Sequence, residues 1–143
     1  MPTFRYDTTG VWLKGNTHIH STASDGGKTF PELAQMYAGK GYDFLFRTDH
    51  WVASDVAAEA EAEAADAHLI WMDGIELDGR DYGGSAYHVA CLGSFTGMTR
   101  EMGFVAALEA ARSQGGLLIL AHPHWTGNSF EDALRWRFHG VEV

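Results

Sequence analysis

Histidine is the residue type in this sequence whose placement is most suited to catalysis. His18 and His20 stand two residues apart, and because side chains alternate along a strand, this spacing puts both imidazoles on one face. Glu76, His88 and His122 follow in or after later strand-like segments. Imidazole and carboxylate ligands without sulfur are typical of hydrolytic Zn, Mn or Fe centres. The pattern therefore predicts a metal centre that activates water.

Three further polar residues stand at comparable positions. Asp49 and His50 close another strand-like segment, and Asp25 lies in a Ser-Asp-Gly-Gly loop, which by itself is also typical of an ordinary turn. Clustered acids and imidazoles cost desolvation energy, and the acids repel one another, unless a cation is bound. A shared metal site therefore explains the set better than packing does. His68 and His139 are expected to be structural.

Short apolar segments alternating with helix-like stretches must position these side chains. The strand-sized segments are Gly15 to His20, Asp43 to Thr48, Leu69 to Leu77, Ala86 to Leu92, Leu117 to Ala121 and Gly140 to Val143. The predicted helices are Pro31 to Lys40, Ser54 to Ala67, Glu101 to Gln114 and Ser129 to Arg137. This alternation predicts an α/β fold with parallel strands, whose ends of one sense share a rim.

The composition limits the domain count and the partners. The chain has 143 residues, 45% of them hydrophobic, which predicts one domain over residues 1–143. A net charge of −9 disfavours double-stranded nucleic acid as a partner. The single cysteine, Cys91, and the lack of an apolar run of about 18 residues predict a reducing, cytoplasmic setting and no membrane span.

The order of the motifs resembles that of the PHP (polymerase and histidinol phosphatase) family. The similarity runs from about Trp12 to Val143 and is carried by Gly15-Asn16-Thr17-His18-Ile19-His20-Ser21, Ser24-Asp25-Gly26, Thr48-Asp49-His50, Gly74-Ile75-Glu76, His88 and Ala121-His122-Pro123. Within the family, the branch with the CehA/McbA-type metallohydrolases looks most similar, on Trp12-Leu13-Lys14-Gly15, His122-Pro123-His124-Trp125 and Gly140-Val141-Glu142-Val143.

The resemblance implies a distorted (β/α)7 TIM-like barrel with outer helices and a centre of two or three divalent ions that hydrolyses phosphoesters. Carried over by position, the implied ligands are His18 and His20 for the first ion, Glu76 as a bridge to the second, His88 and His122 for the second, and Asp25 and His50 for the third. Asp49 and His124 are candidate catalytic residues, Asp49 to orient an imidazole and His124 to contact the substrate.

One family feature is missing after these motifs. Family members end the site with an Asp-x-His motif behind a further strand, and no Asp-x-His follows His122. Such barrels need about 200 to 250 residues, so six strands predict an incomplete barrel. A fragment of a longer protein, a partner chain that completes the barrel, or a decayed non-catalytic module would each explain this. We expect a fragment, because the sequence stops directly after a strand.

The expected reaction is hydrolysis of a small anionic phosphoester by water activated between metal ions. The same centre would also suit carboxyl or carbamate esters. A nuclease for short oligonucleotides is another alternative, although the basic residues it would need are scattered. The alternative from a different class is a metal-binding or interaction module without turnover.

Overall fold

The structure is a computed structural model that describes residues 9–55 and 69–143. In chain order its elements are β1 (Gly15–Asn16), α1 (Phe30–Ala38), β2 (Phe44–Arg47), β3 (Ile70–Arg80), β4 (Ala86–Leu92), η1 (Arg100–Met102), α3 (Phe104–Ser113), β5 (Leu117–Leu120), α4 (Pro123–Thr126), α5 (Phe130–Arg135) and β6 (Gly140–Val141). The α/β class is confirmed. Most of the helix predicted over Ser54 to Ala67 lies outside the described residues.

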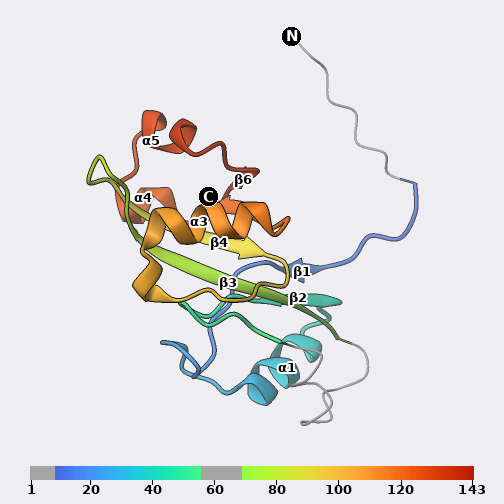
Figure 1. Cartoon of the computed structure of the whole chain (residues 1–143). Coiled ribbons are helices and arrows are strands. Elements are labelled where there is room, and N and C mark those ends of the chain that lie inside the picture. The colour runs from blue at the N-terminus through green and yellow to red at the C-terminus, as the bar shows by residue number, and fades with distance from the viewer. Residues whose placement is uncertain (1–8, 56–68) are drawn as a thin grey trace.

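The six strands form one sheet in chain order, from β1 to β6 (Figure 1). The pairs β1/β2, β2/β3 and β5/β6 are parallel, whereas β4 is antiparallel to both of its neighbours. The prediction that all strands are parallel is therefore wrong. The link between β3 and β4 is only residues 81–85, too short for the crossover of about a dozen residues that parallel neighbours require.

The sheet curls, so that its first and last strands approach each other. His18, just after β1, and Glu142, just after β6, come within 3.3 Å through their side chains. This curled sheet has the form of a half-barrel and agrees with the partial barrel expected from the sequence. The curl therefore brings together side chains from segments that are far apart in the sequence, such as His18 and Glu142.

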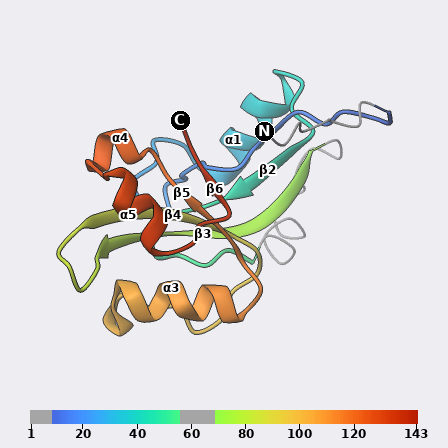
Figure 2. The same cartoon turned by 90° about the horizontal axis from the view of Figure 1, so that it is seen from above.

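The larger apolar core lies between the strands β3 to β5 and the helix α3. Ile75 and Leu77 of β3 and Leu108 of α3 are fully buried there. Figure 2 shows α1, which packs on β2, on the opposite side of the molecule from α3. Because side chains alternate along a strand, Glu76 points away from α3. The face opposite the core thus carries the polar groups.

Several predicted boundaries shift in the structure. The first strand shortens to β1, so that His18 and His20 lie in the loop behind it. The helix predicted over Glu101 to Gln114 is divided into η1 and α3 at Gly103, whose φ of +81° is accessible to glycine without strain. The short helix α4 was not predicted. Among the described residues, no helix has the length and apolar character needed to span a membrane.

Candidate metal centre

Glu76 lies at the centre of the site. Its side chain is fully buried, and its main chain is hydrogen-bonded to the segment that follows β2. The Glu76 N–H donates to the Asp49 carbonyl (3.1 Å), and the Trp51 N–H donates to the Glu76 carbonyl (3.0 Å). These two bonds form a parallel bridge that fixes His50 beside Glu76.

Three imidazoles converge on one oxygen of this carboxylate. The Nε2 atoms of His20, His18 and His50 lie 2.6, 3.1 and 3.2 Å from Glu76 Oε2. The Nε2 atoms of His18 and His20 are also 3.1 Å apart. If these two nitrogens share a hydrogen bond, one of them must present a lone pair. The cluster is therefore rich in the unprotonated nitrogen that binds metal ions.

The second oxygen of Glu76 faces two more imidazoles. Glu76 Oε1 lies 2.9 Å from His88 Nδ1 and 3.5 Å from His122 Nε2. His88 lies at the same edge of the sheet as the other imidazoles although β4 is antiparallel, because it is near the beginning of its strand. Trp125 of α4 packs against both rings, with centroid distances of 5.6 and 5.0 Å. Glu76 thus connects two groups of imidazoles.

Carboxylates contact the outer nitrogens of the first three rings. The Nδ1 atoms of these rings pair as His20 with Asp25 (2.7 Å), His50 with Asp78 (3.0 Å) and His18 with Glu142 (3.3 Å). A carboxylate at Nδ1 favours the proton there and leaves the Nε2 lone pair free. The hydrogen bonds of His20 with Asp25 and of His18 with Glu142 therefore favour a proton on Nδ1 of these two rings, whereas His50 Nδ1 makes no hydrogen bond of good geometry.

This donor set fits divalent cations. Glu76 Oε2 is buried and makes no hydrogen bond of good geometry, although three ring nitrogens surround it. An oxygen in that situation is stabilised by a positive ion. Among the described residues, four groups have ligand atoms that all lie within 4.8 Å of one another: His18, His20 and Glu76; His50, Glu76 and His88; His18, His122 and Glu142; and His20, Asp25 and His50.

The pKa values in the cluster reflect the same arrangement. Burial alone would raise the pKa of Glu76, but its contacts with His18, His20 and His88 outweigh burial and hold that pKa well below its usual range. Burial opposes a charge on His18, yet Glu76 raises the pKa of His18 and also that of His20. Burial lowers the pKa of His122. The carboxylate of Glu76 and the rings of His18 and His20 thus each stabilise the charged form of the other.

Asp49 is buried and braces the loop that follows His20. Its carboxylate accepts hydrogen bonds from the Ser21 backbone N–H, the Ser24 hydroxyl and Arg47 Nε, each at 2.7 Å. The Ser21 hydroxyl also donates to this carboxylate (2.7 Å), and no imidazole is among its described hydrogen-bond partners, so any orientation of an imidazole acts through the loop. The catalytic role of Asp49 stays a prediction.

His124 lies apart from the cluster. It is exposed on α4, and its neighbour Trp125 is the residue that contacts the site. The contact of His124 with substrate stays a prediction. His139 accepts the Leu118 N–H at Nδ1 (3.0 Å), which agrees with a structural role. His68, and with it the one Asp-x-His in the sequence, Asp66-Ala67-His68, lies outside the described residues.

Two carboxylates of the site were missed by sequence reasoning. Asp78 follows Glu76 by two residues on one strand, so the alternation of side chains was a usable signal. Glu142 accepts the His122 backbone N–H (3.0 Å) as well as contacting His18. Its position after the last strand was a weaker signal, because only the curl of the sheet brings it to His18.

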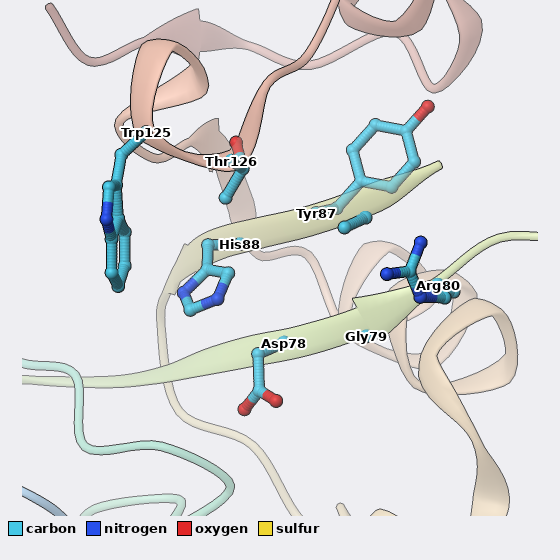
Figure 3. A pocket seen from close by; sticks show the side chains of 8 residues that line it. Asp78, Gly79, Arg80, Tyr87, His88, Trp125 and Thr126 are labelled. Atoms are coloured by element: carbon cyan, nitrogen blue, oxygen red, sulfur yellow. The ribbon is translucent and has the colours of Figure 1, made fainter. Parts of the chain in front are cut away.

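A pocket of about 330 Å³ adjoins the cluster. It is lined by Asp78, Gly79, Arg80, Ala86, Tyr87, His88, Trp125 and Thr126. Figure 3 shows Trp125 beside the ring of His88, Asp78 on the neighbouring strand and Arg80 farther along the same strand. This volume suits a small organic ligand. The pocket can therefore hold the organic part of a molecule whose charged group lies against the cluster.

The fold is similar to those of solved proteins from three bacteria. A two-domain protein from Bacteroides vulgatus, described as containing a predicted PHP-like metal-dependent phosphoesterase, aligns with 92% of this chain and 44% of its own at a TM-score of 0.69 and 21% identity. A protein from Bifidobacterium adolescentis with the proposed activity of a metal-dependent phosphoesterase aligns with 90% of this chain and 77% of its own (TM-score 0.64, 16% identity). An amidohydrolase from Chromobacterium violaceum, solved with bound sulfate and no metal, aligns with 90% of this chain and 75% of its own (TM-score 0.63, 15% identity).

A sequence match to a curated protein is shorter. The DNA polymerase/3'-5' exonuclease PolX of Bacillus subtilis is 34% identical in an alignment of 79 residues that covers 46% of this chain and 14% of that protein. No family model matches the chain. The chain thus spans a small part of the curated relative and less than half of the Bacteroides vulgatus protein. The structural likeness establishes the shared fold and agrees with the resemblance to PHP-like phosphoesterases, and the CehA/McbA-type branch stays a prediction.

Proposed function

We propose that this chain, which has the fold of PHP-like metal-dependent phosphoesterases, forms the metal centre of a hydrolase that cleaves small phosphoesters. The observation that carries the proposal is the buried carboxylate of Glu76 with five imidazoles around its two oxygens. A few hydrogen-bond donors satisfy a buried carboxylate in an ordinary protein interior, so five imidazoles exceed what stability alone requires. Metal-dependent hydrolysis is also the activity associated with the structural neighbours.

Two or three ions would be held by the residues gathered at the rim. His18, His20 and Glu76 supply one set of ligands, Glu76 bridges to His88 and His122, and His50 with Asp25 supplies a third set. Bound divalent ions of the Zn, Mn or Fe type supply Lewis acidity, which activates water and neutralises charge on phosphoryl oxygens.

The protein groups around the centre orient the ligands and receive the substrate. Asp25 and Glu142 are hydrogen-bonded to Nδ1 of His20 and His18, Asp78 lies 3.0 Å from His50 Nδ1, and Asp49 braces the loop behind His20. The pocket beside His88 offers the indole of Trp125 to the organic part of the substrate. Its volume of about 330 Å³ and the net charge of −9 favour a small phosphoester over a nucleic-acid duplex.

Metal binding is the direct test. The chain is stripped with a chelator, reconstituted separately with Zn²⁺, Mn²⁺ and Fe²⁺, and analysed for bound metal and for hydrolysis of p-nitrophenyl phosphate. We expect at least two ions per chain, and expect Glu76→Gln and His18→Ala to lose metal and any turnover while the circular dichroism spectrum is kept. Glu109→Gln, which changes an exposed carboxylate on α3, is the matched control. A reconstituted wild-type chain without bound metal would overturn the proposal.

A second candidate reaction is hydrolysis of a carboxyl or carbamate ester at the same centre. It is favoured by the similarity to an amidohydrolase. Hydrolysis of p-nitrophenyl acetate but not p-nitrophenyl phosphate by the metal-loaded chain would support it. Metal uptake without turnover of either substrate would support a binding module instead.

A further inference from the structure

Arg80 brings a positive charge to the far end of the pocket beside the cluster. It lies two residues after Asp78 and four after Glu76 on β3, so the alternation of side chains places all three on one face of the sheet. Gly79, the residue before Arg80, faces α3 instead, because a Cβ there would lie 2.6 Å from the Cβ of Phe104. Arg80 therefore lies on the same face as the cluster, and it lines the pocket.

The pairing of β3 with β4 indicates the length of the pocket. Asp78 is the partner of His88, and Arg80 is the partner of Ala86. Two residues along a strand correspond to about 7 Å. Figure 3 shows Trp125 beside His88 at one end and Arg80 at the other. A ligand that reaches both His88 and Arg80 therefore needs an organic part of this length, such as an aromatic ring with substituents at opposite positions.

The carboxylates next to Arg80 along the strand are paired with other arginines. Both oxygens of Asp78, which lines the same pocket, accept hydrogen bonds from Arg100, each at 3.1 Å. Asp81 is buried and forms an ion pair with Arg135. These two carboxylates therefore neither neutralise Arg80 nor leave an uncompensated negative charge that would repel an anion from the pocket.

The guanidinium of Arg80 is positioned and still has donors to offer. Among the described contacts its polar partner is the Gly84 carbonyl, at 2.6 Å, and no carboxylate pairs with it. This hydrogen bond holds the side chain against the turn between β3 and β4. A guanidinium has five N–H donors, so the others are available to a ligand. Arg80 is exposed, and a ligand in the pocket can reach it.

We propose that Arg80 selects small phosphoesters whose organic part carries a second anionic group, a carboxylate or a phosphate, at the end away from the metal centre. Arg80 binds this group through two parallel N–H donors, the geometry in which arginine recognises both kinds of anion. The indole of Trp125 contacts the organic part between the two anions. Arg80 is thus a specificity-determining residue, remote from the reacting atoms. The inference rests on the proposed function, because the metal centre holds the first anion.

Binding of phosphonates that cannot be hydrolysed tests this without turnover. The Zn²⁺-loaded full chain is titrated in a calorimeter with 4-(phosphonomethyl)benzoate and with the corresponding amide, which has the same shape and no second charge. We expect the carboxylate to bind about 10-fold more tightly, because a hydrogen bond to a charged group contributes roughly that factor. p-Xylylenediphosphonate carries a phosphonate at each end. Tighter binding of either dianionic compound supports the proposal, and comparison of the two identifies the second group as carboxylate or phosphate.

Variants assign the effect to Arg80. Arg80→Gln should abolish the advantage of the second anion and leave the affinity for the amide unchanged, and Arg80→Lys should keep part of the advantage. The control is Arg137→Gln, which changes an exposed arginine that does not line this pocket and should keep all of it. An advantage that survives in Arg80→Gln would overturn the inference.

The wild-type chain separates this inference from the proposed function, whether or not the variants fold. Equal affinity for the amide and for both doubly anionic compounds would overturn the role of Arg80 alone, since the metal centre would still have bound the phosphonate. A chain that binds none of the three compounds would refute the proposed function and the inference with it.

Discussion

Glu76 is a carboxylate without exposed surface, and its neighbours show how the protein compensates for burying it. Each of its oxygens lies near at least two imidazoles, and these hold the pKa of Glu76 below its usual range. Protonated rings and a bound cation are alternative counter-charges, because both place positive charge beside the same oxygens. Metal binding should therefore change the stability of the chain as well as its chemistry.

The first prediction concerns this stabilisation. A divalent ion that binds the folded chain at a hundredfold excess over Kd adds about 2.7 kcal/mol, which raises Tm by roughly 10 °C. Thermal unfolding followed by circular dichroism, with and without Zn²⁺ or Mn²⁺, measures the shift, and a chelator should reverse it. Glu76→Gln should show little or no shift. A shift that is equally large in Glu76→Gln would place the ion elsewhere.

Cys91 gives a second prediction at the residue scale. Burial, with a smaller contribution from the charge of Glu76, raises the pKa of its thiol from 9.0 to about 12. The thiolate is the reactive form, so at pH 8 the reactive fraction falls roughly 1,000-fold. Native chain should react with a disulfide dye only very slowly, and urea-unfolded chain should react at the rate of a free thiol. Fast labelling of the native chain would show that β4 opens readily.

At the scale of elements, the positions of strands and helices followed from periodicity, whereas strand direction did not. Strands β2, β4 and β5 lie within a few residues of their predicted bounds, because alternation and apolar runs are local properties. The reversed direction of β4 depends on the length of one link. Residues 81–85, Asp-Tyr-Gly-Gly-Ser, carried that signal, since a short glycine-containing link between two strands is typical of a hairpin.

The loop after β1 supports a prediction with an internal control. A Cβ at Gly26 would lie 2.2 Å from the His20 carbonyl oxygen, whereas a Cβ at Gly27 would meet nothing within 4 Å. Gly26→Ala should therefore displace Asp25 from His20 and destabilise the chain by about 1 to 3 kcal/mol. Gly27→Ala should stay within about 0.5 kcal/mol of wild type. Urea unfolding of both variants makes the comparison, and equal stabilities would contradict the crowding at Gly26.

At the scale of the whole molecule, side chains join the two edges of the curled sheet. Glu142, next to the last strand, contacts His18 behind the first strand and also accepts the His122 N–H. The rings of His18 and His122 stack at 5.5 Å. These side-chain contacts therefore also hold the first and last strands of the sheet together. Among the described strands, no backbone pairing joins β1 to β6.

Removing Glu142 should loosen that closure. Glu142→Ala is expected to cost the metal-free chain about 1 kcal/mol, the usual value of a partly exposed charge-assisted contact. The His122 amide should exchange faster with deuterium, because it loses its acceptor. Glu109→Ala on α3 is the control and should change neither. Unaltered His122 exchange in Glu142→Ala would show that the two edges are held together in another way.

The sequence by itself determined the chemical character of the site: paired histidines behind a strand, a glutamate on a buried strand, and further imidazoles in later segments, with nitrogen and oxygen donors only. Local spacing is enough for this, because alternation along a strand fixes which side chains share a face. The tertiary structure alone decided the ion pair of Arg100 with Asp78 and the contact of Glu142 with His18 across 124 positions. Those features depend on how far the sheet curls and which loops fold over it, and no short-range pattern of residues encodes either.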